Sequence, residues 1–175
     1  CGPCKFMDKN IFTLDSVGEF INKNFVSIKM DMEKGEGLQL AQKYEVTSFP
    51  TFLIIQPDST LQHKVIGGSP TGGEFIARIE EGLDPDKAEG LLRAQYEKGN
   101  RAIGFMTKYI NALISTRNYE EADKIAQSLI ASLTDDETTD KAFWFIFENK
   151  FTTSLKSPNF TYLLRNKTAF DQSIG

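Results

Sequence analysis

The chain has 175 residues, 40% of them hydrophobic and 14 of them phenylalanine, so it is long and apolar enough for one large globular domain or two small ones. Its net charge of −4 and the absence of any lysine or arginine run argue against nucleic acid or an anionic membrane as the main partner. No apolar run approaches the ~20 residues that span a bilayer, so we expect no membrane insertion.

The chain opens on Cys1-Gly2-Pro3-Cys4, which contains its only two cysteines. Cysteines three positions apart lie one turn apart if a helix begins there, so their sulfurs can close a disulfide. The free N–H groups at such a helix end favour the thiolate form of the first cysteine, and Pro3 is tolerated in a first turn. Reversible dithiol–disulfide exchange needs a thiolate beside a second thiol, so the motif predicts a thiol–disulfide oxidoreductase site.

Other uses of these cysteines are less consistent with the sequence. Structural zinc takes four Cys or His ligands, whereas this chain offers two cysteines and the single His63, so we expect no metal. The α-amino group of Cys1 could serve as a base for its own thiol, as in N-terminal-nucleophile hydrolases, but the helical second half argues against that class. Lipidation of Cys1 would remove the nucleophile of an intact dithiol.

Apolar periodicity predicts alternating helices and strands in the first half. The expected elements are a helix from 4 to about 12, a short helix from 15, a strand over 25–32, a helix over 35–44, a buried strand over 52–55, a return strand over 61–66 and a helix over 70–82. Pro57-Asp58-Ser59-Thr60 is a turn signal that makes the last two strands an antiparallel hairpin. We expect His63 and Asp8 to face solvent.

This order of elements, with three short motifs, resembles the thioredoxin family over about residues 1–83. The motifs are Cys1-Gly2-Pro3-Cys4-Lys5, Phe49-Pro50-Thr51 and Gly67-Gly68. The spacing after the second cysteine is most similar to bacterial thioredoxin-like proteins related to the C-terminal domain of periplasmic disulfide-interchange reductases. The resemblance therefore implies an extracytoplasmic location, in a bacterial periplasm or cell envelope.

The resemblance also implies a role for each motif. Cys1 would be the attacking nucleophile and Cys4 the buried resolving thiol, so that their disulfide is the redox centre and no separate cofactor is needed. Substrate-binding positions would be Gly2, Pro3, Phe49, Pro50, Gly67 and Gly68. Within this set, Pro50 would be a cis-proline, Phe49 would offer backbone groups to an extended substrate, and the glycines would allow close approach. The partners would be protein disulfides and an upstream thiol reductant, and the Gly-Pro pair favours a reductase.

One departure from the family is large. Thioredoxin-like proteins have a hydrophobic strand immediately before the first cysteine, whereas this sequence starts at Cys1. Loss of a central strand would leave backbone groups of its neighbours unpaired, so we expect the chain to be a fragment of a longer one. The predicted fold class is α/β: a thioredoxin-like fold lacking its N-terminal strand, followed by a small all-α domain.

The second half, residues 84–175, carries helical patterns only. Helices are expected over 86–97, 101–115, 119–133 and 142–147, with a last one from 157. The second and third form an αα-hairpin whose sequence from Asn118 is weakly similar to a tetratricopeptide repeat. An alternative function follows, in which this helical domain recognises a protein partner and residues 1–83 serve as a scaffold.

Overall fold

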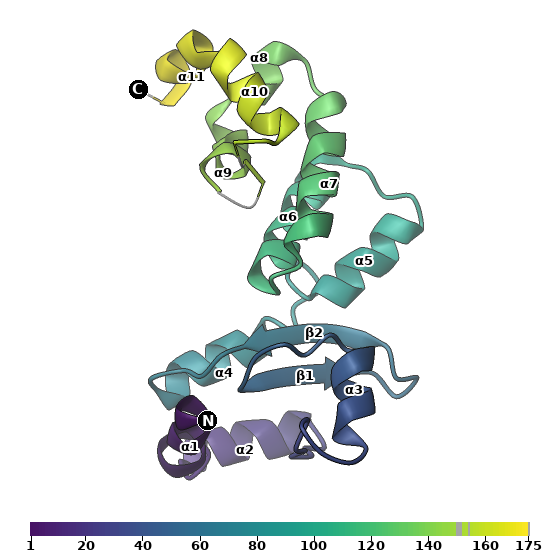
Figure 1. Ribbon diagram of the computed structural model, residues 1–175, viewed down its shortest axis with the longest axis vertical. Helices are drawn as coiled ribbons and strands as arrows, with labels where there is room; N and C mark the ends of the chain where they lie inside the picture. Colours follow the sequence, from purple (N-terminus) through teal and green to yellow (C-terminus); the bar gives the residue numbers. More distant parts are fainter. Residues whose placement is uncertain (150–151, 154, 175) are drawn as a thin grey trace. The chain divides into compact units, whose positions relative to one another are not determined.

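The computed structural model describes residues 1–149, 152–153 and 155–174. The chain forms two compact units, Cys1–Leu91 and Leu92–Gly175 (Figure 1). The boundary expected after residue 83 lies within the first unit, shortly before helix α5 (Glu89–Glu97), which continues from the first unit into the second.

The first unit combines helices with one antiparallel hairpin (Figure 1). Its elements are α1 (Gly2–Phe6), the π-helical turn η1 (Met7–Ile11), α2 (Asp15–Asn24), α3 (Gly37–Lys43), β1 (Thr51–Ile55), β2 (Leu61–Ile66) and α4 (Gly72–Glu80). The predicted hairpin is confirmed, with Thr51 opposite Ile66 and an irregularity between Ile54 and Ile55. The strand expected to be buried over 52–55 is fully buried only at Ile54, and Ile55 is 42% exposed, so the prediction of a buried strand is wrong.

The core of this unit joins the first helices to the hairpin. Met7 and Ile11 lie four positions apart, on one helix face, and both are almost completely buried. The other buried apolar residues of this core are Val17, Ile54, Val65, Phe75 and Ile79. Phe12, Phe52 and Phe75 pack edge to face against one another, with centroids 4.9 to 6.0 Å apart. The cysteine-bearing helix and the turn that follows it thereby pack against the hairpin and α4.

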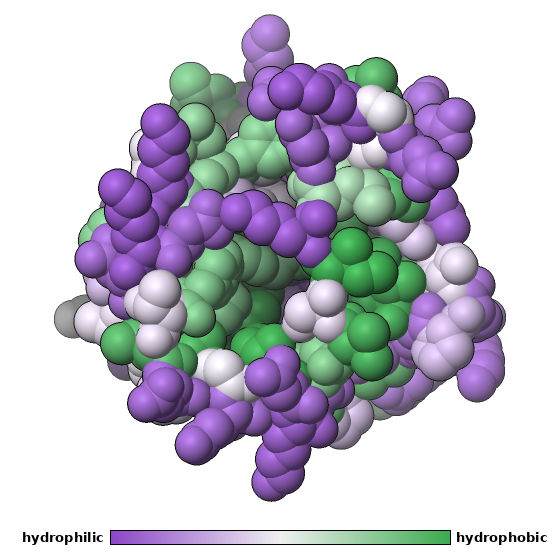
Figure 2. Space-filling view, turned by 90° about the horizontal axis from the view of Figure 1, so that it is seen from below, coloured by the Kyte–Doolittle hydropathy of each residue, from purple (hydrophilic) through white to green (hydrophobic). Residues whose placement is uncertain are grey.

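The strand predicted over 25–32 does not form. Phe25 has extended backbone angles, but β1 and β2 make up the one sheet of the described residues and neither pairs with this segment. Extended backbone becomes a strand only when a neighbour supplies its hydrogen bonds, and alternation in the sequence does not supply that neighbour. Val26 and Ile28 are consequently 97% and 80% exposed. From the side of α1 and α2, apolar side chains gather around a hollow ringed by polar ones (Figure 2).

The described residues of the second unit form helices joined by turns and loops, with no strand among them, and an α/β unit followed by a helical region is the predicted fold class. After α5 come α6 (Ile103–Ser115), α7 (Tyr119–Ala131), α8 (Asp135–Thr138), the 3₁₀ turn η2 (Lys141–Phe143), α9 (Trp144–Glu148), α10 (Pro158–Arg165) and α11 (Lys167–Ile174). The predicted αα-hairpin is α6 and α7, which lie side by side (Figure 1). The single helix expected from 157 is two helices, separated at Asn166.

Contrary to expectation, His63 is buried. The side chain is 3% exposed on β2, and among the described residues its Nδ1 atom has no hydrogen-bond partner. Gly82 packs directly on it, since a Cβ atom at residue 82 would lie 3.1 Å from the Cβ atom of His63. This burial lowers the pKa of His63, and the negative charges of Glu81 and Glu89 offset only part of the effect.

We expect the stability of the protein to fall as the pH is lowered from about 7 to 5, because an unfolded histidine titrates near about 6.5. The folded state, with its lowered histidine pKa, binds fewer protons in this pH range than the unfolded state. The free energy of unfolding therefore rises with pH, and the loss caused by protonation of His63 disappears above this range. Urea unfolding of the wild type and of His63→Gln between these pH values tests this. The variant should show the flatter dependence, because His63 is the only histidine. If the free energy of unfolding changed equally with pH in the wild type and in His63→Gln, His63 would not be the cause of the pH dependence.

Candidate active site

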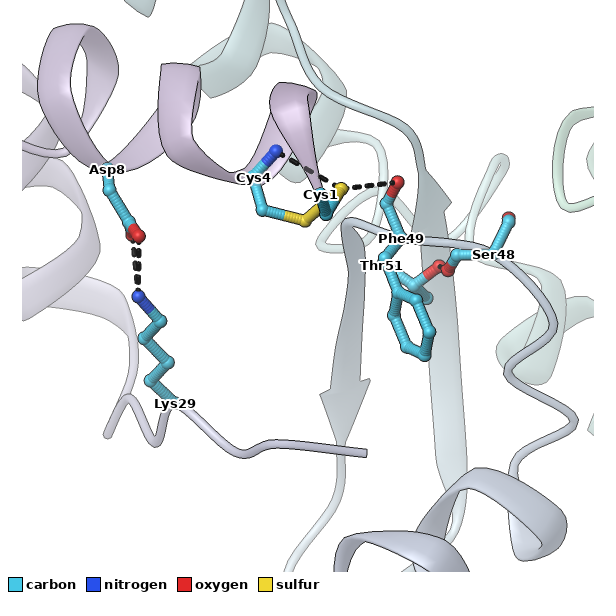
Figure 3. Close-up of a disulfide and its surroundings, with 7 residues drawn as sticks. All are labelled: Cys1, Cys4, Asp8, Lys29, Ser48, Phe49 and Thr51. Carbon is cyan, nitrogen blue, oxygen red and sulfur yellow. Dashed lines mark hydrogen bonds and ion pairs between the residues drawn. A yellow bond between two sulfur atoms is a disulfide. The ribbon is translucent and has the colours of Figure 1, made fainter. Parts of the chain in front are cut away.

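The cysteine pair occupies the start of the first helix. Cys1 is the N-cap of α1 and is exposed, whereas Cys4 is half-buried. A disulfide joins them, with their Cα atoms 5.3 Å apart, and the Cys4 N–H donates to Cys1 Sγ at 3.4 Å (Figure 3). Pro3 lies in the first turn, where no intrahelical N–H is required. A negative charge on Cys1 Sγ would thus meet a backbone N–H and the positive end of the helix.

The loop before β1 faces this disulfide. The carbonyl oxygen of Phe49 lies 3.5 Å from Cys1 Sγ, a distance at which a reduced Cys1 thiol would donate to it (Figure 3). The Phe49–Pro50 peptide bond is cis. Two hydrogen bonds fix the loop: the Thr51 hydroxyl donates to the Ser48 carbonyl at 2.7 Å, and the Gly67 N–H donates to the Pro50 carbonyl at 2.8 Å.

The loop after β2 completes the site. Gly67 has φ +89°, a conformation that side chains rarely adopt. A Cβ atom at Gly68 would lie 3.4 Å from the Met7 side chain and 4.0 Å from the Pro3 carbonyl oxygen, so this loop packs closely on the cysteine-bearing helix. At Gly2, by contrast, a Cβ atom would point into open space. The structure thus brings the three predicted motifs together around one exposed disulfide.

An ion pair lies one helical turn beyond Cys4. Asp8, expected at the surface, is partly exposed, and both its carboxylate oxygens accept from Lys29 Nζ at 2.7 and 2.8 Å (Figure 3). The Lys29 side chain is 78% exposed, so the pair adds little stability. It ties the 25–32 segment to the helix, a contact that the sequence did not indicate because Asp8 and Lys29 are far apart in the chain.

Two further residues support the site from within the fold. Met7 is fully buried beneath the helix, and its sulfur accepts from the Ser69 N–H at 3.3 Å. Arg78 of α4 donates to the backbone of the loop after β2. Neither residue has a sequence signal for this role, since one fits an ordinary apolar helix face and the other an exposed helix position.

In the first unit, a Cys-Gly-Pro-Cys helix packs on an antiparallel hairpin, and a proline loop faces the cysteines. This is the arrangement of a thioredoxin-like domain. Residues 1–83 match the family model of a thioredoxin-like domain, which a helical region follows in this chain. Comparison with curated proteins and with solved structures found no match.

Two further properties concern the described residues only. None of their helices is both long and apolar enough to cross a membrane. They also contain no group of three or more His, Cys, Asp or Glu side chains placed to hold a metal ion.

Proposed function

We propose that the chain is a thiol–disulfide oxidoreductase that reduces protein disulfides. The observation that carries this proposal is the position of Cys1. It is exposed at the N-cap of α1, bonded to Cys4, and 3.5 Å from the Phe49 carbonyl oxygen. The thioredoxin-like family match over residues 1–83 supports the same chemistry.

The reaction has two exchange steps. The Cys1 thiolate attacks one sulfur of the substrate disulfide; that bond breaks, the other substrate sulfur leaves as a thiolate and takes up a proton, and a mixed disulfide remains. The Cys4 thiolate, formed by loss of its proton, then attacks Cys1 Sγ. The Cys1–Cys4 disulfide forms, the second substrate thiolate leaves, and two electrons have passed to the substrate. A thiol reductant must return them before the next turnover.

The surrounding backbone would hold the substrate beside the sulfurs. An extended peptide can pair with the backbone of Phe49, next to Pro50, and Gly67, where a Cβ atom would point into open space, leaves room for its main chain. Gly68 has no side chain between the loop and Met7, so its backbone lies close to the active-site helix and can contact the same peptide. Gly2 and Pro3 are exposed between the cysteines and would contact the substrate from the helix side. All six positions are thus proposed as the substrate-binding surface.

The equilibrium reduction potential of the Cys1–Cys4 pair tests both the chemistry and its direction. We expect a value near about −270 mV, as for a thioredoxin-type reductase, when the full chain is equilibrated with glutathione or dithiothreitol buffers. A value between about −180 and −120 mV would instead make the protein an isomerase or an oxidase. A pair that does not cycle in these buffers would eliminate the enzymatic function and leave partner binding as the better account.

A further inference from the structure

Arg78 concentrates its hydrogen bonds on the loop that faces the disulfide. From α4, its Nη2 atom donates to the Ile66 carbonyl at 2.6 Å. Its Nη1 atom is shared by the Gly68 carbonyl at 3.0 Å, the Ser69 hydroxyl at 3.1 Å and the Gly67 carbonyl at 3.4 Å. Within the described residues it forms no ion pair with a carboxylate. The charge of the guanidinium is therefore directed at three consecutive backbone carbonyls.

Three consecutive carbonyls do not face one group in an extended strand, where successive carbonyls point to opposite sides. The positive φ of Gly67 bends the chain out of that geometry. The planar fork of an arginine can then reach carbonyls on either side of the bend with two different nitrogens, which the single ammonium of a lysine cannot do.

The orientation of these carbonyls also orients the N–H groups of the loop, because the C=O and N–H of a trans peptide unit point in opposite directions. The Ile66 carbonyl faces Arg78, and the N–H of the same unit, on Gly67, donates to Pro50 at 2.8 Å. The Gly68 carbonyl faces Arg78, and the N–H of its unit, on Ser69, donates to Met7 Sδ at 3.3 Å. Arg78 thus lies on one side of the loop, and the active-site helix and proline loop lie on the other.

The middle peptide unit follows the same rule. Its carbonyl, on Gly67, faces Arg78 at 3.4 Å, so its N–H, on Gly68, points toward the side of the active-site helix and the proline loop. In the described part of the chain this N–H has no hydrogen-bond partner, and no side chain at residue 68 covers it. It is a donor directed at the surface where a substrate peptide would lie.

We propose that Arg78 is a positioning residue for disulfide exchange: it fixes the 66–69 loop so that the loop holds the Phe49-Pro50 backbone in register with Cys1 and presents the Gly68 N–H to a carbonyl of the substrate peptide. This inference rests on the proposed function. It predicts that Arg78 matters for substrates with a polypeptide backbone and not for the chemistry of the sulfurs.

The test compares two disulfides on the full chain. With insulin as the protein substrate, Arg78→Gln should lower kcat/KM about tenfold through a raised KM, the loss expected for about one hydrogen bond to substrate. With dithiobis(nitrobenzoate), which has no peptide backbone, the rate should stay within about twofold. Arg78→Lys should fall between wild type and Arg78→Gln. Arg101→Gln is the matched control, because Arg101 also donates to backbone carbonyls but lies in the second unit.

Equal losses on both substrates, or no loss on insulin, would overturn the positioning role. Amide hydrogen exchange gives a readout that does not depend on activity: the Gly67 and Ser69 amides should exchange faster in Arg78→Gln, and unchanged exchange would also overturn it. If the wild type reduced neither disulfide, the proposed function would fail and the positioning role with it. The amide exchange rates would then still show whether Arg78 orders the loop.

Discussion

Replacing Cys1 by serine is expected to lower insulin reduction by more than about a thousandfold, a loss of the size seen when a catalytic nucleophile is removed. A serine hydroxyl is a far weaker nucleophile than a thiolate, and the Cys4 N–H at 3.4 Å cannot compensate. Insulin turbidity measures the rate. Far-UV circular dichroism is the control for folding, and we expect it to be unchanged because Cys1 is exposed.

Cys4→Ser is the matched control for this experiment. It keeps the exposed nucleophile and removes the resolving thiol, so the first exchange step should proceed and the mixed disulfide should accumulate. Mass spectrometry of the unreduced protein would show a Cys1 adduct with substrate in this variant and none in Cys1→Ser. An adduct in Cys1→Ser and none in Cys4→Ser would make Cys4 the attacking cysteine. Full activity in Cys1→Ser would favour the alternative function, in which the first unit is a scaffold.

The order of attack assigned here follows from how differently the two cysteines are placed. Cys1 is exposed and receives a backbone N–H, while Cys4 is half-buried one turn into the helix. A bulky protein disulfide can reach only an exposed sulfur. The less exposed one is protected from outside disulfides but lies within reach of the mixed disulfide at Cys1.

The local features of this fold could be predicted from the sequence, because their causes are local. The helix start at the cysteine motif, the turn at 57–60 and the apolar faces of α6 and α7 each depend on a few neighbouring residues. Periodicity was less informative at helix ends. Ile103 has the spacing of the apolar face of α6, and Leu164 that of α10, but they are 44% and 60% exposed. Periodicity identifies the apolar face of a helix and does not say how far the element that packs against this face extends.

The features that could not be predicted depend on contacts between distant parts of the chain. The 25–32 segment alternates like a strand, yet strand formation depends on a neighbour that its own residues do not encode. His63 is buried because Gly82 and Ile54 pack against its strand, and a histidine beside a lysine gives no sign of that. Arg78 binds carbonyl oxygens, which every residue carries and no sequence pattern marks.

The second large effect is expected for Met7→Ala. The Met7 side chain is fully buried, lies 3.4 Å from the position that a Cβ atom of Gly68 would occupy, and accepts from the Ser69 N–H. Truncation to alanine would leave a cavity beneath the active-site helix and an unpaired buried N–H, at a cost of about 2–5 kcal/mol in the free energy of unfolding. The total free energy of unfolding of a single domain is only about 5–15 kcal/mol, so we expect the midpoint of urea unfolding to fall markedly. Circular dichroism measures this midpoint.

Met7→Leu separates packing from the sulfur contact. Leucine has nearly the volume of methionine, so the change in packing alone should lower the free energy of unfolding by less than about 1.5 kcal/mol. Leucine cannot accept the hydrogen bond from the Ser69 N–H. Met106→Leu is the matched control, because Met106 is also buried, at 2% exposure, and its sulfur accepts no hydrogen bond among the described residues. A larger loss for Met7→Leu than for Met106→Leu would measure the Ser69 contact. Equal losses would show that Met7 supports the site by volume alone, and an unshifted midpoint in Met7→Ala would contradict its place in the core.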